Sequence, residues 1–176
     1  MEQSLDKIIC LVGESGSGKT TLAMRLERES YNVIKSYTTR PPRYPNEWGH
    51  IFVLEEEYWK QKKSEMLAYT YFDGYHYWAK FEQYKGKGIS LYIIDPQGVK
   101  DLKETVKDAE IVVIYLKVDQ EERINRMIKA GRKEEDIKKR VKHDSLKFKI
   151  VCCDYVVDNN GSIDETLEVI KKLIKK

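Results

Sequence analysis

A glycine-rich octapeptide that directly follows an apolar run limits what this chain can fold into more than any other feature. Residues 7–12, Lys-Ile-Ile-Cys-Leu-Val, have the continuous apolar pattern of a strand buried on both faces. Residues 13–20, Gly-Glu-Ser-Gly-Ser-Gly-Lys-Thr, fit G-x-x-x-x-G-K-[ST], and a helical pattern follows at about 19–29. Strand, loop and helix in this order predict a phosphate-binding loop. The alternative, a Gly/Ser turn that matches by chance, is disfavoured by this context.

The residues of this loop have separate expected roles. Lys19 can place a full charge at the β and γ phosphates of ATP, which makes it the first catalytic candidate, and Thr20 offers a hydroxyl to Mg²⁺. ATP and Mg²⁺ are therefore the expected cofactors. The other expected ATP contacts in the loop and the first helical turn are Gly13, Ser15, Gly16, Ser17, Gly18 and Thr21.

Strand patterns and helix patterns alternate along most of the chain. Apolar strand-like runs recur at 32–34, 89–94, 111–116 and 155–157, and helical patterns lie at about 97–106, 119–130, 134–147 and 162–174. Alternation of this kind predicts a mostly parallel sheet covered by helices on both faces. We expect one three-layer α/β domain over residues 1–176.

Residues 37–84 break this rhythm. They hold three of the four prolines, all three tryptophans and eight of the twelve tyrosines. A short helix around 55–64 and strands at 50–54, 67–72 and 76–80 are expected there. We interpret this segment as an inserted subdomain with its own small, antiparallel sheet. Its aromatics, such as Trp78 and Tyr71, could form the subdomain core or stack on a bound base.

Composition argues against several partners. The 32 basic and 29 acidic residues leave a net charge of +3, too balanced for a surface that binds nucleic acid or membrane. The first residues lack the pattern of a signal peptide, so a cytoplasmic location is expected. Cys10, Cys152 and Cys153 have no metal or disulfide spacing and are expected to be buried thiols.

Two further segments carry charge suited to a phosphorylated acceptor. Arg40 and Arg43 lie in a proline-rich turn, and rigid guanidinium groups bind phosphate dianions well, although two exposed loop arginines are the plain alternative. Asp95 ends the run at 89–94, where it could order Mg²⁺, contact the acceptor, or cap the next helix. Gly131 and Arg132 interrupt two helical segments, as expected of a hinged lid that brings arginine to the transferred phosphate.

Taken together, these motifs resemble those of the guanylate kinase family along nearly the whole chain. The P-loop is followed, in the family's order and approximate spacing, by four elements: Thr-Thr-Arg-Pro-Pro-Arg at 38–43, Phe-Asp-Gly-Tyr-His-Tyr at 72–77, Ile-Asp-Pro-Gln-Gly-Val at 94–99 and Asp-Tyr-Val-Val at 154–157. The resemblance implies a core that carries ATP, an acceptor-binding subdomain at 37–84 and a lid at 128–142. It implies transfer of phosphate from ATP to a nucleoside monophosphate, GMP or dGMP, in purine nucleotide metabolism.

The resemblance also assigns residues. Arg40, Arg43 and Tyr77 match residues that hold the acceptor phosphate, and Ser36 matches a base contact. Asp95 matches a carboxylate close to acceptor and metal. The lid arginines, which neutralise the transferring phosphoryl group, are matched by Arg126, Arg132 and Arg140; Arg126 is counted with the ATP site, and Arg132 and Arg140 are the preferred catalytic candidates.

Three positions depart from the family pattern. Ala68 stands where a glutamate usually pairs with guanine, His50 lies nearest a tyrosine that contacts the acceptor phosphate, and Ile93 replaces an aspartate. These changes leave two other functions open. One is a kinase of the same fold for another nucleoside monophosphate or a sugar such as ribose 1,5-bisphosphate, because loss of a buried hydrogen-bonding group alters specificity strongly. The other is a non-catalytic interaction module, which the complete P-loop disfavours.

Overall fold

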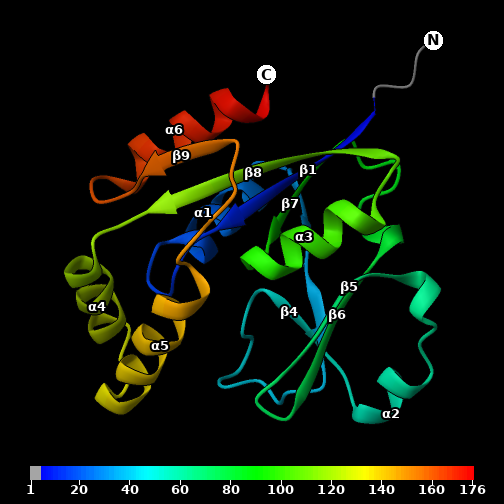
Figure 1. The fold of residues 1–176 in the computed structure, drawn as a ribbon, viewed down its shortest axis with the longest axis horizontal. Helices are drawn as coiled ribbons and strands as arrows, with labels where there is room; N and C mark the ends of the chain where they lie inside the picture. Colours follow the sequence, from blue (N-terminus) through cyan, green and yellow to red (C-terminus); the bar gives the residue numbers. More distant parts are fainter. Residues whose placement is uncertain (1–4) are drawn as a thin grey trace.

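A five-stranded parallel sheet forms the centre of the fold in the computed structural model, which describes residues 5–176 (Figure 1). Its strand order is β2-β7-β1-β8-β9, and every neighbouring pair is parallel. The strands are β1 (Asp6–Val12), β2 (Asn32–Ile34), β7 (Ile89–Ile93), β8 (Ala109–Lys117) and β9 (Tyr155–Asp158). The predicted parallel sheet is confirmed.

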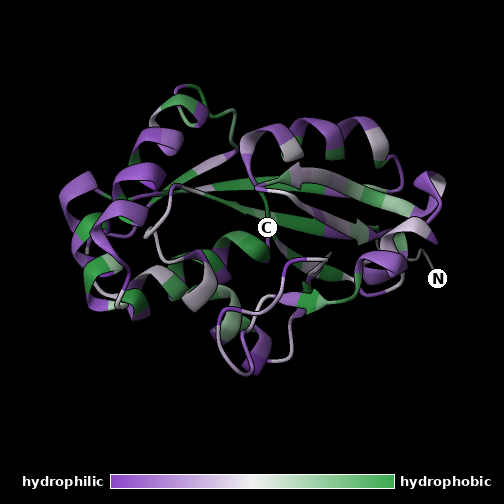
Figure 2. Cartoon of the chain, turned by 90° about the horizontal axis from the view of Figure 1, so that it is seen from below, coloured by the Kyte–Doolittle hydropathy of each residue, from purple (hydrophilic) through white to green (hydrophobic). Residues whose placement is uncertain are grey.

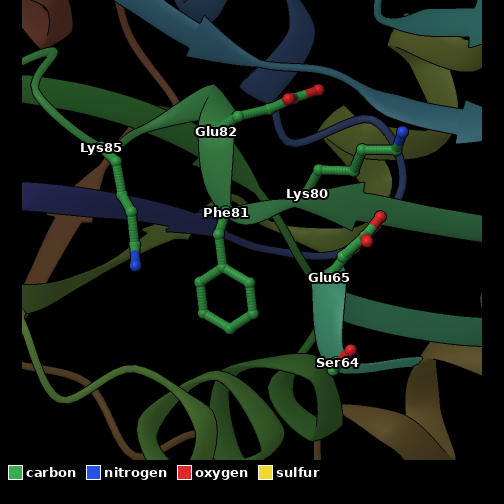
Figure 3. Close-up of a pocket in the computed structure, with 6 residues that line it drawn as sticks. All are labelled: Ser64, Glu65, Lys80, Phe81, Glu82 and Lys85. Carbon is green, nitrogen blue, oxygen red and sulfur yellow. The ribbon is translucent and has the colours of Figure 1, made fainter. Parts of the chain in front are cut away.

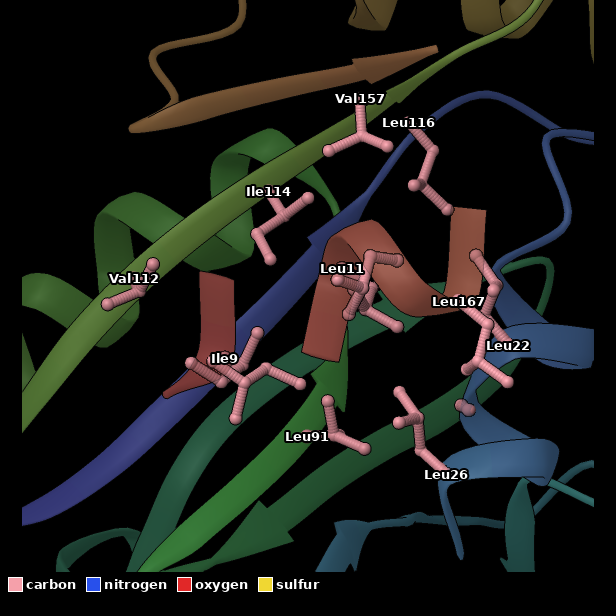
Figure 4. Packing of buried hydrophobic residues seen from close by; sticks show 13 residues of the cluster. Ile9, Leu11, Leu22, Leu26, Leu91, Val112, Ile114, Leu116, Val157 and Leu167 are labelled. Atoms are coloured by element: carbon pink, nitrogen blue, oxygen red, sulfur yellow. The ribbon is translucent and has the colours of Figure 1, made fainter. Parts of the chain in front are cut away.

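Helices cover both faces of this sheet. On one face, α1 (Lys19–Arg28) and α6 (Ile163–Ile174) pack with Ile9 and Leu11 in one apolar cluster, seen in Figure 4. On the other face, α3 (Pro96–Thr105) packs with Ile8, Cys10 and Val12 in a second cluster. Successive residues of β1 therefore enter opposite cores, which explains why the strand is apolar without interruption. The predicted three layers are present.

The segment between β2 and β7 contains a second sheet with strand order β4-β3-β6-β5. Its strands are β3 (Ser36–Thr38), β4 (His50–Phe52), β5 (Met66–Phe72) and β6 (Tyr75–Lys80). The short elements beside it are α2 (Glu55–Trp59) and the 3₁₀ turns η1 (Lys63–Glu65) and η2 (Phe81–Gln83).

This second sheet corrects two expectations. It is mixed rather than antiparallel, because the chain returns through residues 39–49 before β4 and so pairs β4 parallel to β3. The helix expected over 55–64 ends at Trp59, and η1 follows after a break. Trp78 is buried, whereas Tyr69 and Tyr71 are exposed, so only part of the aromatic set forms a core.

Two helices follow β8 and turn back on each other. They are α4 (Gln120–Lys129) and α5 (Glu134–Lys147), and Gly131 between them has a φ of 76°, a left-handed conformation that favours glycine. Both lie beside the loop that follows β1 in Figure 1. Figure 2 shows hydrophobic strands at the centre and largely hydrophilic helix surfaces around them. Within residues 5–176 no helix has the length and apolar character needed to span a bilayer.

The cysteines correct one further expectation. Cys10 is buried in the core, as predicted, and burial raises the pKa of its thiol to about 12. Cys152 is exposed and Cys153 is half-buried, because both lie in the irregular segment between α5 and β9 rather than in a strand. All three are free thiols.

Candidate active site

The loop from Gly13 to Thr20 has a backbone that only glycine permits at three points. Gly16 and Gly18 have φ angles of 82° and 94°. A Cβ on Gly16 would lie 2.6 Å from the Arg123 carbonyl oxygen, and one on Gly13 would lie 2.9 Å from the Leu116 carbonyl oxygen. The glycines of the motif therefore let the loop lie directly against its neighbours.

The side chain of Asn159 connects this loop to α6. Its side-chain amide is fully buried, donates to the carbonyl oxygen of Ser17 at 2.8 Å, and accepts from the Thr166 hydroxyl at 2.7 Å. Asn159 therefore holds the phosphate loop against α6, while Asp158 is exposed and accepts from the Asn160 N–H.

The side chain of Lys19 turns back onto the phosphate loop. Its ammonium group donates to the carbonyl oxygens of Gly13 at 2.6 Å and Glu14 at 2.9 Å, and to the Ser17 hydroxyl at 3.2 Å. Burial lowers the pKa of Lys19 to about 8, against the opposing effect of the nearby carboxylates of Asp144 and Glu14. Thr20 and Thr21 are exposed on the first turn of α1.

This low pKa predicts that the binding of ATP phosphates at the loop, expected from the sequence, depends on pH. Below pH 8 Lys19 is mostly protonated in the free protein, and above it a proton must be taken up before the ammonium can bind phosphate. We expect the Kd for ATP to rise above pH 8, by up to about tenfold per pH unit. Titration calorimetry from pH ~7 to ~9.5 measures this, and Lys19→Arg, whose group stays charged, should give a flatter profile. A flat wild-type profile would contradict the burial effect.

Arg123 and Arg126 approach the loop from α4. Arg126 donates to the Asn159 carbonyl oxygen at 2.7 Å and to Glu122 at 2.8 Å, which places it beside the start of α1. Arg123 is buried beneath the loop, with its guanidinium 3.4 Å from the Ser15 carbonyl oxygen and 4.0 Å from Glu14. Arg123 was not among the site residues predicted from the sequence. Its spacing of three from Arg126, on the same helix face, was the available signal.

Arg40 and Arg43, the two arginines predicted to bind the acceptor, share one carboxylate. Arg40 forms a two-pronged pair with Glu47, at 2.8 and 3.2 Å, and both side chains are less than 10% exposed. The Arg43 backbone N–H donates to the same carboxylate at 2.7 Å, while its side chain is half exposed. Burial would lower the pKa of Arg40, but the Glu47 carboxylate more than offsets it, so the pKa is raised. Glu47 was missed from the sequence because nothing local distinguishes it from other loop acids.

The other predicted acceptor residues surround this pair. The His50 ring packs edge-on against Tyr77 at 5.7 Å, and its buried Nδ1 has no partner among the described residues. Burial and the charge of Arg40 lower the pKa of His50, so the ring is neutral near pH 7. Ser36 lies opposite His50 in the β3–β4 pairing, and its hydroxyl is 3.2 Å from the buried Tyr92 hydroxyl. All five sequence-predicted acceptor groups in this sheet region therefore lie close together.

Asp95, Arg132 and Arg140 are the remaining predicted site residues. Asp95 accepts from the Gly98 N–H at 2.7 Å, as the capping alternative predicted, and its other oxygen is 2.5 Å from Lys147. Arg132 and Arg140 are partly buried, and burial lowers the pKa of each, with the positive charge of Arg43 adding to this effect. Both arginines remain cations near neutral pH. Arg132 and Arg140 therefore lie close enough to Arg43 for its charge to act on them, and the charge of Arg132 also acts on Lys19 of the phosphate loop.

A separate hollow lies elsewhere on the insert. It is lined by Ser64, Glu65, Lys80, Phe81, Glu82 and Lys85 (Figure 3). It shares no residue with the cluster around Lys19 and Arg40, and its charged rim is exposed. The concentration of buried charge therefore singles out the region around the phosphate loop, and not this hollow, as the candidate active site.

Sequence comparison identifies the family of this chain. The guanylate kinase family model matches residues 5–176. The chain belongs to the guanylate kinase family. It is 33% identical to a guanylate kinase of Wolbachia from Brugia malayi over an alignment of 184 positions, which covers 96% of this chain and 92% of the relative. It is 30% identical to a guanylate kinase of Anaplasma phagocytophilum, with 99% and 89% covered.

A solved structure has the same fold. The crystal structure of guanylate kinase from Anaplasma phagocytophilum aligns with a TM-score of 0.68 at 24% identity, covering 99% of this chain and 87% of that chain. Ala68, which the sequence analysis matched to the family's base-pairing glutamate, lies on β5 opposite Ala79 of β6.

Proposed function

We propose that this protein transfers the γ-phosphoryl group of ATP to a nucleoside monophosphate, GMP or dGMP, and releases two nucleoside diphosphates. The observation that carries the proposal is the electrostatic proximity of three cationic groups. The charge of Arg132 acts on Lys19 in the phosphate loop, and the charge of Arg43 acts on Arg132 and Arg140. Arg43 in turn shares the Glu47 carboxylate with Arg40. Phosphoryl transfer needs positioning and charge neutralisation rather than a strong base, and this arrangement supplies both.

The proposed division of roles follows the position of each group. The loop N–H groups, Lys19 and Arg126 hold ATP, while Arg40, Arg43, His50 and Tyr77 hold the acceptor phosphate. Ser36 lies at the base end of this site. Arg132 and Arg140 neutralise charge on the transferring group, with residues 128–142 acting as a lid and 37–84 as the acceptor-binding subdomain.

Mg²⁺ is the proposed metal. Within residues 5–176 no three His, Cys, Asp or Glu side chains gather to form a metal cage. The exposed Thr20 hydroxyl at the start of α1 suits an ion that is held mainly by phosphate oxygens and water, as Mg²⁺ is in nucleotide sites. Thr20 would hold the ion, with Asp95 ordering its water ligands, and bound Mg²⁺ would neutralise phosphate charge. We propose that the protein acts on small molecules in the cytoplasm.

A second acceptor class is favoured by one observation. Ala68 cannot pair with the N1 and N2 hydrogens of guanine, and the nearby Ser36 and Tyr92 hydroxyls are bonded to each other. A kinase of this fold that phosphorylates another monophosphate, or ribose 1,5-bisphosphate, would keep the same phosphate-binding groups. The alternative changes the acceptor and leaves the chemistry unchanged.

A coupled assay of ADP formation distinguishes the two. ATP and Mg²⁺ are supplied with GMP, dGMP, AMP, CMP, UMP, dTMP or ribose 1,5-bisphosphate. Preference for GMP and dGMP supports the proposed function and means that Ser36 and backbone groups read guanine. Turnover with another acceptor while GMP is inactive would replace it with the alternative, and no ADP above background with any acceptor would contradict both.

A further inference from the structure

A buried carboxylate of α5 lies on the phosphate loop. The Asp144 side chain is 8% exposed, and its Oδ2 accepts from the backbone N–H of Ser15 at 2.7 Å. Its Oδ1 is 3.7 Å from Nδ1 of His143. Residues 15 and 144 are 129 positions apart in the chain, so this contact exists only through the fold. The roles proposed above make no use of Asp144.

The Asp144 carboxylate lies among positively charged side chains. Its charge raises the pKa of Lys19, Arg132 and Arg140 in opposition to the larger lowering effect of burial on each. Among the described residues, none of these cations lies within 4.0 Å of the carboxylate, which bonds instead to a loop N–H. Backbone N–H groups of such a loop and nearby cations are the groups that bind phosphate oxygens. The Asp144 carboxylate therefore occupies an environment suited to a phosphate oxygen.

A second contact fixes the helix that carries Asp144. Lys147, one turn further along α5, has its ammonium group 2.5 Å from Oδ2 of Asp95. Residues three apart in a helix share a face, so one face of α5 contacts both the phosphate loop and Asp95. Asp144 is therefore held at the loop by a second, independent anchor.

We propose that Asp144 acts as an internal anion, which occupies the phosphate loop in the nucleotide-free protein and lowers its affinity for ATP. This inference rests on the proposed function, because it assumes that ATP phosphates bind at this loop. A fixed negative charge within several ångströms of a triphosphate is repulsive, and partial burial strengthens the effect. ATP must either displace the carboxylate from the Ser15 N–H or bind next to it, and both weaken binding.

Calorimetric titration with the β,γ-imido analogue of ATP, in Mg²⁺ and without acceptor, tests the proposal. The proteins are wild type, Asp144→Ala and Asp144→Asn. Both variants remove the charge, and only Asn keeps an acceptor for the Ser15 N–H. We expect each to bind the analogue about tenfold tighter than wild type. The gain should shrink between about 0.05 M and about 0.5 M NaCl, because salt screens charge repulsion.

Glu121→Gln is the matched control. Glu121 is an exposed acid in the first turn of α4, outside the proposed lid, so loss of its charge should change the Kd by less than about twofold. Thermal unfolding confirms that each variant is folded. If Asp144→Ala does not fold, Asp144→Asn, which preserves shape and acceptor, gives the test alone.

The other possible results of the titrations either support or overturn the proposal. Unchanged binding in both variants overturns it. Weaker binding in Asp144→Ala with wild-type binding in Asp144→Asn also overturns it, since the residue would then merely support the loop. Tighter analogue binding together with no phosphorylation of any acceptor keeps this inference and rejects the proposed function. If no protein binds the analogue, both fail.

Discussion

Replacing Lys19 by alanine is expected to lower kcat for ADP formation by about a thousandfold or more. The lysine is the residue in the phosphate loop whose charge can follow the transferred phosphate, and it already lies in the loop, bonded to the Gly13 and Glu14 carbonyl oxygens. Loss of a preorganised charge from a partly enclosed site is costly because water cannot replace it during the reaction. Initial rates at saturating ATP and acceptor measure the effect.

The fold should survive this substitution. The pKa of Lys19 is lowered to about 8 from an ordinary value of 10.5, so its charge opposes folding below pH 8, and this cost is relieved as the pH rises toward 10.5. Lys19→Ala is therefore expected to keep or raise the Tm at pH 7. Lys19→Arg serves as the comparison that retains charge without the same geometry. Near-normal turnover in Lys19→Ala would contradict the assignment of the phosphate loop.

Replacing Arg40 by alanine is expected to lower kcat/KM for the acceptor by about a hundredfold to a thousandfold, with the KM for ATP within about twofold of wild type. Arg40 is the buried member of the acceptor pair, and its guanidinium is oriented by Glu47 at 2.8 and 3.2 Å. Its loss removes a rigid donor and also leaves the Glu47 carboxylate buried near an incoming phosphate. Steady-state kinetics with each substrate varied separately give the two constants.

Arg43 provides a graded comparison for Arg40. Its side chain is 51% exposed, so Arg43→Ala should raise the acceptor KM only about tenfold. Arg28→Ala, at the exposed end of α1, controls for a general loss of positive charge and should have little effect. Circular dichroism checks that Arg40→Ala is folded. A rise in the KM for ATP alone, in either Arg40→Ala or Arg43→Ala, would show that the proposed assignment of the ATP and acceptor sites is reversed.

The sequence predicted the parts of this molecule that depend on local pattern. The strand at 7–12 is apolar throughout because alternate residues enter two different cores, and the glycines at 16 and 18 mark positive φ angles. Both signals are readable within a few residues. The helices at 119–130 and 134–147 were predicted for the same reason, and α4 and α5 fall within two residues of those bounds.

The residues that the sequence did not reveal act at long range. Glu47 pairs with Arg40 only after the loop at 39–49 has folded back, and Asn159 reaches Ser17 across 142 residues. Asp144 looks like one acid in a charged helix until α5 is placed on the phosphate loop. Pattern and propensity carry no information about such pairs, because the tertiary fold brings their partners together. The strand β3 was missed because its residues, Ser-Tyr-Thr at 36–38, do not form an apolar run like that of the equally short β2.

The most direct test of the central claim is the stoichiometry of the products. ATP, GMP and Mg²⁺ are incubated with the protein, and all four nucleotides are separated and quantified over time. Phosphoryl transfer at the proposed site predicts that ADP and GDP appear in equal amounts, with no release of inorganic phosphate, and that both form about a thousandfold more slowly with Lys19→Ala. Release of inorganic phosphate with ADP and without a phosphorylated acceptor, or no consumption of ATP at all, would contradict it.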